Sequence, residues 1–341
     1  MAGRRTNLTL LVLLAGALAT GVLAYGIGTG WARWAVVGHG VLGLAIVLLI
    51  PWKSLIARRG LRRRRPGSLA SLVLAALVAL AIAFGVLHST GLLVSMGPIT
   101  SMQVHVGAAL LALPLALWHV LARRVRVRRT DLSRRNLLRA GALAGGAGLV
   151  YAGAEVLVRL GSLPGGRRRF TGSHETGSFR PEAMPVTQWL NDSVPDVDPA
   201  RWRLMVSIDP ATGIAEGGRA WTYPELAAFE DRVRATVDCT GGWYAEQEWE
   251  GVWLSRLLPA TGEARSVAVR SVTGYPRRFP MADAPRLLLA TRAGGRPLDA
   301  GHGFPARIVA PGRRGFWWVK WVERIEVSTV PWWWQPPFPL S

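Results

Sequence analysis

Cys239 is the only cysteine of the chain, and its position suits it to metal binding. It follows a β-type segment at 232–238 and precedes Gly241 and Gly242, so its sulfur is expected at a loop where a ligand can approach the backbone closely. A thiolate is a soft metal ligand. The alternative is a small buried hydrophobic residue. A single cysteine excludes an intramolecular disulfide and a thiolate cluster for zinc or iron–sulfur.

Histidines within apolar segments form a second set of candidate ligands. They are His39, His88, His105 and His119. His105 and His119 are 14 positions apart, which on one helix means about 21 Å and nearly the same face. This spacing resembles that of haem-binding helices in b-type cytochromes, and it implies one haem b held by His105 with His39 or His88. His119 has no second histidine at its level, where Lys53 stands instead. The alternative is that these histidines only hydrogen-bond between helices.

Five apolar segments in the first half are long enough to cross a bilayer, which takes about 20 residues. Residues 1–169 carry 22 Lys and Arg against 2 Asp and Glu, and 17 of these basic residues fall on one side of the predicted membrane. Basic loops stay in the cytoplasm. We therefore expect a bacterial cytoplasmic-membrane protein whose N-terminus is inside and whose residues after the fifth span are outside. The segments lie near 8–27, 34–51, 69–87, 102–121 and 137–158.

Arg134 and Arg135, within the motif at 133–139, precede the fifth apolar segment. Paired arginines at this place resemble a twin-arginine export signal. Such export carries folded proteins, which suits a domain that receives its cofactor in the cytoplasm. The alternative is that they are two further basic residues of a cytoplasmic loop.

Residues 170–330 have the composition of a soluble domain rich in strands. Residues 170–341 carry 19 basic and 19 acidic side chains, and this neutrality argues against a nucleic-acid partner. Strands are predicted at 201–208, 232–238, 266–272, 307–310 and 317–327, with a short helix at 223–229. The predicted fold class is an all-α bundle of five transmembrane helices over residues 1–160, followed by an α+β, mainly β, domain over 170–330. Residues 161–169 are predicted as a hinge. The aromatic tail at 331–341 is predicted to lie on lipid headgroups or to cover the domain core.

Four blocks of the second half resemble, in order, the molybdopterin oxidoreductases of sulfite-oxidase type. They lie at 239–254, 271–276, 298–312 and 315–321. The resemblance covers roughly 170–330 and implies the molybdopterin-binding fold, with Cys239 as the protein ligand of molybdenum. It also implies that polar and basic side chains hold the pterin, namely His302, Arg307, Arg313, Arg314 and Lys320. Tyr275 either borders the substrate or is a core aromatic residue.

The chain departs from the sulfite-oxidising members of this family. Those members place Asn and Arg soon after the cysteine, whereas this chain has Gly, Trp and Tyr and then Glu246, Glu248 and Glu250. Acidic residues near the metal would repel sulfite. The chain is more similar to the bacterial periplasmic branch, which includes the catalytic subunit of methionine-sulfoxide reductase. We expect a monomeric catalytic domain, because no Ig-like dimerisation domain follows residue 330.

Together these features predict a membrane-bound, molybdopterin-dependent oxidoreductase. It would transfer an oxygen atom on a small-molecule substrate outside the cytoplasmic membrane and exchange electrons through haem b with the quinone pool or another membrane carrier. Two alternatives stay open. One is a cofactor-free, membrane-anchored binding module. The other is a molybdenum enzyme whose spans only anchor it beside a separate cytochrome.

Overall fold

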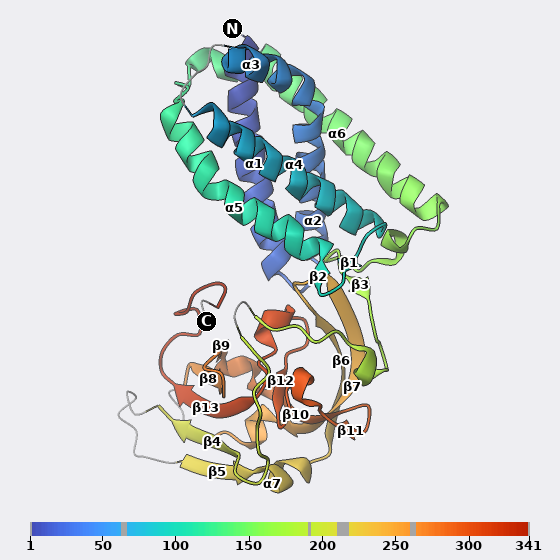
Figure 1. The fold of residues 1–341 in the computed structure, drawn as a ribbon. Coiled ribbons are helices and arrows are strands. Elements are labelled where there is room, and N and C mark those ends of the chain that lie inside the picture. The colour runs from blue at the N-terminus through green and yellow to red at the C-terminus, as the bar shows by residue number, and fades with distance from the viewer. Residues whose placement is uncertain (1, 63–66, 190–191, 210–217, 260–263, 340–341) are drawn as a thin grey trace. The chain divides into compact units, whose positions relative to one another are not determined.

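The computed structural model describes residues 2–62, 67–189, 192–209, 218–259 and 264–339. The chain divides into two units, Met1–His174 and Glu175–Ser341. The first unit is helical, and the second is built mainly of strands (Figure 1). This division confirms the predicted fold class of a helical part followed by a mainly β part.

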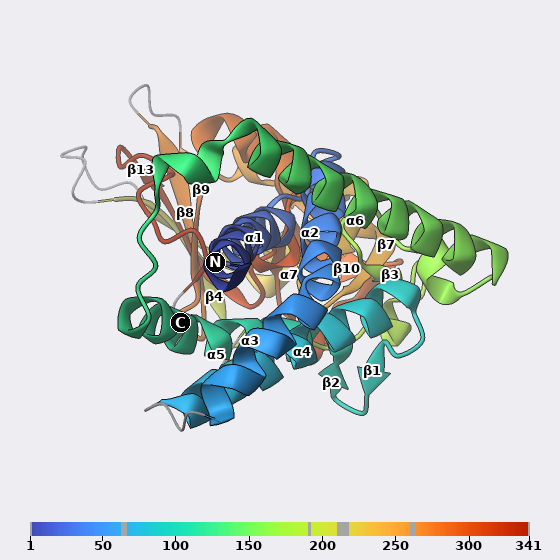
Figure 2. The same cartoon turned by 90° about the horizontal axis from the view of Figure 1, so that it is seen from above.

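Six α-helices make up the first unit (Figure 2). Four of them, α1, α4, α5 and α6, are long and apolar enough to cross a membrane. α2 has 17 residues and continues, after a bend of 50°, into α3. Their bounds are α1 (Ala2–Gly26), α2 (Ala32–Leu48), α3 (Ile50–Arg62), α4 (Ser68–Thr90), α5 (Ser101–Ala122) and α6 (Arg134–Leu160).

The second predicted span, 34–51, is therefore a bent pair of helices, whereas the other four predicted spans each coincide with one helix. Pro51 is the second residue of α3. Proline has no N–H to donate to the carbonyl four residues earlier, so it interrupts a helix that continues through it but is tolerated in a first turn. This explains why α2 stops at Leu48.

Small residues allow the helices of the first unit to approach closely. Leu13 of α1, Ala45 and Ile46 of α2 and Ala147 of α6 form one buried cluster. Alanine at such contacts lets helix backbones pack, which supplies van der Waals contact where lipid supplies no hydrophobic driving force. α4 packs along α5, and the short strands β1 (Ser95–Met96) and β2 (Ile99–Thr100) connect these two helices.

Residues 161–169, predicted as a hinge, pack against the helical unit. They include the 3-10 helix η2 (Pro164–Arg167). A Cβ at Gly165 would collide with the carbonyl oxygen of Ser89. Arg168 forms an ion pair with Glu155 and donates to the carbonyl of Ser89 at 3.0 Å. Glycine is thus required here for close approach and not for flexibility.

Two sheets form the second unit. In one, β10 lies between β11 and β7, β6 also pairs with β7, and β12 also pairs with β10. The other has the order β5–β4–β13–β8–β9, in which only β4 and β13 are parallel. The two-residue strand β3 (His174–Glu175) lies at the division between the units. The remaining strands are β4 (Arg203–Ile208), β5 (Gly218–Thr222), β6 (Asp231–Asp238), β7 (Trp243–Trp253), β8 (Ser266–Ser271), β9 (Pro276–Pro280), β10 (Leu288–Ala293), β11 (Arg296–Pro297), β12 (Arg307–Val309) and β13 (Val322–Ser328).

Most of the predicted strands are present, and one differs. β4, β6, β8 and β12 agree with the prediction within two residues, and α7 (Tyr223–Ala227) begins at the predicted helix start. The strand predicted at 317–327 begins only at Val322. Before it lies the 3-10 helix η8 (Gly315–Trp317), and Trp321 has a φ of 51°, which is incompatible with a strand. β5, β7, β9 and β10 were not predicted from the sequence.

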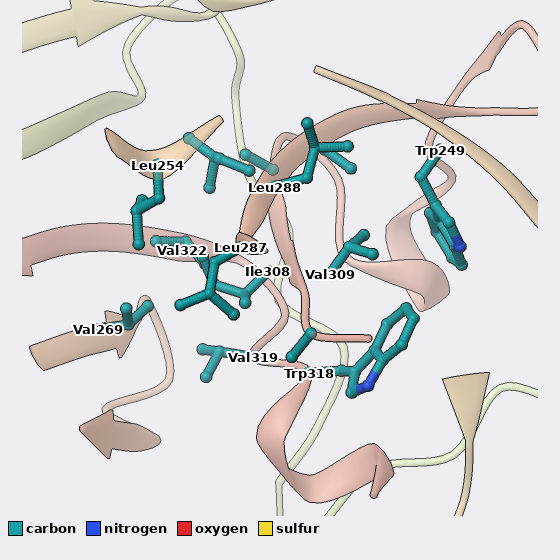
Figure 3. Packing of buried hydrophobic residues seen from close by; sticks show 14 of the residues in the cluster. Trp249, Leu254, Val269, Leu287, Leu288, Ile308, Val309, Trp318, Val319 and Val322 are labelled. Atoms are coloured by element: carbon teal, nitrogen blue, oxygen red, sulfur yellow. The ribbon is translucent and has the colours of Figure 1, made fainter. Parts of the chain in front are cut away.

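The buried core of the second unit holds the segments that carry the site (Figure 3). Ile308 of β12 and Val319 before β13 pack with Leu254 and Leu288, and all four are at most 1% exposed. Burial of each such side chain contributes about 1.5–3 kcal/mol. The core therefore fixes the backbone on which Arg307 and Lys320, the neighbours of Ile308 and Val319, are placed.

Candidate functional site

Cys239 lies in the tight loop that connects β6 to β7. Its backbone N–H donates to the carbonyl of Trp243 at 2.9 Å, and the N–H of Gly242 donates to the carbonyl of Cys239 at 3.2 Å. Gly242 has a φ of 93°, which favours glycine. The N–H of Gly241 donates to Sγ of Cys239 at 3.3 Å. A donor beside the sulfur suits a negatively charged thiolate, so the loop presents Cys239 as a metal ligand.

Thr187 joins Cys239 to Lys320, although the three residues are far apart in the sequence. Its hydroxyl lies 3.4 Å from Sγ of Cys239. Its backbone carbonyl accepts a hydrogen bond from Nζ of Lys320 at 2.8 Å, and Nζ also donates to the carbonyl of Gly301 at 2.6 Å. Two backbone acceptors therefore hold the ammonium group close to the thiol.

Arg307, the first residue of β12, is a second buried cation at this site. Nη1 donates to the carbonyl of His302 at 2.9 Å, and the guanidinium carbon lies 5.1 Å from the ring centre of Trp249. A Cβ at Gly303, which has a φ of 110°, would lie 3.0 Å from Cβ of Arg307 and 3.2 Å from Cβ of Lys320. Glycine is therefore required where the segments that carry the two cations meet.

His302 is buried and holds the turn that precedes Arg307. It ends the 3-10 helix η7 (Ala300–His302), and the carboxylate of Asp299 accepts a hydrogen bond from its backbone N–H at 3.0 Å. Nε2 donates to the carbonyl of Met184 at 3.1 Å, and Nδ1 lies 2.8 Å from the carboxylate of Asp299. Both ring nitrogens thus contact protein groups, so His302 positions the cation next to it.

The charges around Cys239 call for a further anion. Within the described part of the chain, neither Arg307 nor Lys320 belongs to a salt bridge, and Nε of Arg307 is buried without a hydrogen-bond partner. Burial lowers the pKa of Arg307 to about 10 and, together with the charge of Arg307, the pKa of Lys320 to about 7, whereas a charge on Cys239 raises both. Buried cations without a counter-charge cost several kcal/mol. The residues therefore fit an anionic, sulfur-bearing group such as molybdopterin, with its phosphate and dithiolene sulfurs.

Lys320→Met is expected to remove a pH dependence from the stability of the cofactor-free protein. Folding lowers the pKa of Lys320 from 10.5 to about 7, so the unfolded chain binds one more proton between these two values. Stability therefore rises with pH across this window, by on the order of 1 kcal/mol per pH unit. Thermal unfolding of wild type and variant, followed by tryptophan fluorescence near both limits of the window, measures it. An equal rise in both proteins would contradict the buried, unpaired ammonium.

Arg313 and Arg314 are neighbours in the sequence but make separate contacts. Arg314 forms a buried ion pair with Asp238, and its Nη2 donates to the carbonyl of Cys239 at 3.2 Å. Arg313 forms an ion pair with Asp283, which lies in a different segment. The structure therefore brings Arg314 to the cysteine loop as a group that positions Cys239, and it engages Arg313 elsewhere.

Replacing Arg314 with alanine is expected to lower the free energy of unfolding by about 3–5 kcal/mol. The change leaves the carboxylate of Asp238, which is 2% exposed, buried without its partner. The matched control is Arg313→Ala, whose ion pair with Asp283 is partly exposed, and for which we expect a loss of about 0–1 kcal/mol. Denaturant unfolding followed by tryptophan fluorescence compares the two, and losses of similar size would refute this distinction.

Tyr275 belongs to an aromatic group beside the cysteine loop. Its hydroxyl donates to the carbonyl of Phe316 at 2.5 Å. The ring centre of Trp189 lies 6.5 Å from that of Tyr275 and 5.9 Å from that of Phe316. Phe316 follows Gly315, where a Cβ would lie 3.0 Å from Cα of Cys239. Tyr275 is 7% exposed and packs in the core, so aromatic rings are what the fold places on this side of Cys239.

The C-terminal tail packs on the same aromatic group. The ring centre of Phe338 lies 5.5 Å from that of Phe316, and the carbonyl of Pro339 accepts a hydrogen bond from Nε1 of Trp189 at 3.1 Å. Trp333 is 61% exposed. Of the two placements predicted for the tail, covering the domain core describes its second half.

His39 of α2 and His105 of α5 face each other in the helical unit. Their ring centres are 5.6 Å apart, and the ring planes are nearly perpendicular, at 86°. Nδ1 of His39 donates to the carbonyl of Ala17 at 2.8 Å, and Nδ1 of His105 donates to the carbonyl of Ala81 at 2.7 Å. Because a carbonyl only accepts, both protons lie on Nδ1. Nε2 of each ring is then the nitrogen that can ligate a metal.

His88 and His119 lie outside this pair. The rings of His88 and His174 are 4.8 Å apart, and Nε2 of His174 donates to the carbonyl of His88 at 2.8 Å. Nδ1 of His119 lies 3.1 Å from the hydroxyl of Ser71. Of the two partners considered for His105, the structure therefore places His39 beside it.

Three residues of the candidate site were missed in the sequence. Asp299 stands three positions before His302, a spacing typical of a helix cap, and Asp238 stands directly before Cys239. Both patterns were available. Thr187 lies in an irregular segment without periodicity, 52 positions from Cys239, so no local pattern indicated its contact with the thiol.

Comparison with known proteins identifies the second half of the chain. The family model described as oxidoreductase molybdopterin binding domain matches residues 191–333. The putative protein-methionine-sulfoxide reductase subunit YedZ1 of Azospira oryzae is 32% identical over 145 residues, which are 40% of this chain and 53% of that protein. Mitochondrial sulfite oxidase of Rattus norvegicus is 28% identical over 173 residues, 40% of this chain and 31% of that enzyme.

A solved structure is also similar to part of the chain. The crystal structure of the sulfane dehydrogenase SoxCD from Paracoccus pantotrophus matches with a TM-score of 0.37 and 26% identity, over 40% of each chain. The present chain thus spans about half the length of the first curated relative and about a third of the second.

Proposed function

Because residues 191–333 form an oxidoreductase molybdopterin-binding domain, we propose that this protein is a membrane-bound molybdopterin-dependent oxidoreductase that transfers an oxygen atom. The observation that carries the proposal is the thiol of Cys239 beside two buried cations without a protein counter-charge, Arg307 and Lys320. The relatives that share the domain include sulfite oxidase, and the family is one of enzymes.

The residues of this chain divide the work at the site. Cys239 would ligate molybdenum, and Arg307 and Lys320 would neutralise the anionic cofactor. Arg314 holds the cysteine loop through Asp238. When bound, the cofactor supplies two-electron oxygen-atom transfer: an oxidised substrate takes up two electrons and two protons and is released with one water, or the reverse. The neutral aromatic surroundings of Tyr275 favour a small uncharged substrate over a dianion such as sulfite.

We infer that the helical unit exchanges single electrons with this site through a haem b. Support comes from His39 and His105, whose Nδ1 protons are committed to backbone carbonyls and whose rings face each other. Neutral imidazole with a hydrogen-bonded second nitrogen is a common axial haem ligand. The electrons would come from, or pass to, the quinone pool or another membrane carrier.

The proposed orientation in the bacterial cytoplasmic membrane rests on the basic loops. These loops would lie inside and the molybdopterin domain outside. If Arg134 and Arg135 act as a twin-arginine signal, replacing both by lysine is expected to keep the second half of the chain in the cytoplasm. Protease accessibility from outside spheroplasts measures this. Unchanged exposure would show that the two arginines act only as basic loop residues.

Two measurements on detergent-purified, full-length protein test the proposal. Metal and pterin analysis is expected to find molybdenum and one molybdopterin per chain, and an oxidised-minus-reduced optical spectrum is expected to show a b-type haem. Protein without molybdenum, from molybdenum-replete cells, would favour the cofactor-free binding module. Molybdenum without haem would favour the anchored enzyme that depends on a separate cytochrome.

A further inference from the structure

Four polar side chains from four helices gather at one end of the helical unit. Lys53 of α3 donates through Nζ to Oδ1 of Asn7 in α1 at 3.0 Å. The hydroxyl of Ser71 in α4 lies 3.1 Å from Nδ1 of His119 in α5. All four side chains are half-buried. Polar side chains within apolar helices are costly, and their convergence from separate helices indicates a binding site.

These residues lie at the basic end of the helices. Lys53 and Ser71 are each in the first turn of their helix, and His119 is in the last turn of α5. Arg4, near the start of α1, forms an ion pair with Asp131 in the segment that follows α5. By the orientation proposed above, this end faces the cytoplasm, and the cluster sits at the depth of the interface.

The two pairs act on one another and leave donors available. Lys53 is close enough to His119 for its charge to interact with the imidazole. In the described ranges, neither forms a salt bridge, Asn7 is the only side-chain partner of the ammonium, and Ser71 is the only hydrogen-bond partner of the His119 ring. An ammonium has three N–H donors, and an imidazole has a second ring nitrogen. Both residues can therefore bind an acceptor that enters between them.

An aromatic surface borders the same cluster. Trp118 precedes His119, and its ring lies directly over Gly67, where a Cβ would collide with it. Gly67 has a φ of 74° and caps the start of α4, so glycine is required for both reasons. The Trp118 side chain is 38% exposed, which leaves part of a flat ring available for stacking.

We propose that Lys53 and His119 bind the ring carbonyl oxygens of a quinone dissolved in the membrane, with Trp118 beside its ring. A quinone is flat and apolar and carries two carbonyl acceptors, which are the features that match an aromatic surface and two donors at membrane depth. A lipid headgroup would account for Lys53 at the interface. It does not account for His119, whose ring is anchored by Ser71 within the helix pair.

The site gives the proposed enzyme a balanced partner reaction, and to that extent it rests on the proposed function. A quinol that leaves as quinone releases two electrons and two protons. The electrons would pass singly through the haem to molybdenum, where an oxidised substrate, two electrons and two protons give reduced substrate and water. The net reaction is quinol plus oxidised substrate to quinone, reduced substrate and water. His119 lies about 21 Å along α5 from His105, a span that the haem ring partly fills.

Binding to the full-length protein in lipid nanodiscs tests the proposal. The probe is a fluorescent hydroxyquinoline N-oxide, a quinol analogue, and quenching of its fluorescence measures Kd. His119→Ala and Lys53→Met are each expected to weaken binding about tenfold or more, since each removes a hydrogen bond to a ring oxygen. The matched control is Ser54→Ala in α3, whose hydroxyl bonds only to its own helix carbonyl of Pro51. The control should bind as wild type does.

A second readout separates this inference from the proposed function. Reduction of the haem by a short-chain quinol should be slowed about tenfold or more in His119→Ala, while dithionite reduces the haem fully. If the purified protein has no haem but binds the probe through Lys53 and His119, the haem assignment fails and the quinone site stands. Equal Kd values in wild type and both variants would overturn the site. So would weakening that disappears when anionic lipids are left out of the nanodiscs, because the residues would then bind headgroups.

Discussion

Cys239→Ser is expected to lower the molybdenum content of the purified protein by more than about 100-fold. Loss of residues that only support a metal ligand already costs about 10–100-fold in affinity, and this variant removes the single soft ligand that the chain supplies. The charge on Cys239 also offsets the two buried cations, Arg307 and Lys320. Metal analysis of protein from molybdenum-replete cells measures the effect.

The matched control for this experiment is Thr187→Val. It removes the hydroxyl that lies 3.4 Å from Sγ of Cys239 but keeps the backbone carbonyl that binds Lys320. We expect this control to retain most of its molybdenum. If Cys239→Ser retained molybdenum as well as the control does, the thiol would not be the metal ligand, and the assignment of an oxygen-atom-transfer enzyme would fall.

His105→Ala and His39→Ala are each expected to abolish the haem absorption band. Each variant removes one of two imidazoles whose ring centres lie 5.6 Å apart and whose Nδ1 protons are held by helix carbonyls. A haem that keeps only one axial ligand is bound far more weakly, because the lost ligand carries much of the binding energy. The optical spectrum of the dithionite-reduced protein, with haem extracted and counted per chain, measures the loss.

His88→Ala and His119→Ala are the controls for the haem experiment. His88 packs against His174, and His119 bonds to Ser71, so both should keep a full complement of haem. Loss of haem from His88→Ala with retention in His39→Ala would reverse the choice of partner for His105. Retention in all four variants would show that these histidines only connect helices.

The amino-acid sequence by itself determined which segments enter the membrane and where the thiol stands. Apolar runs near 8–27, 69–87, 102–121 and 137–158 became single helices because length and hydropathy alone decide whether a segment spans a bilayer. Cys239 was expected after a strand and before two glycines, and it lies in that loop because turn formation is local. Local rules were also sufficient for α7, where Pro224 occupies the first turn.

Only the tertiary structure decided which of the candidate side chains act together. Arg313 and Arg314 are equivalent in the sequence, but one pairs with Asp283 and the other with Asp238 beside the thiol. His39 and His88 were equal candidates until packing placed His39 against His105. Such contacts join residues tens of positions apart, and they depend on how whole helices and strands pack. No local pattern encodes that packing, because the energy that selects it comes from burial summed over the core.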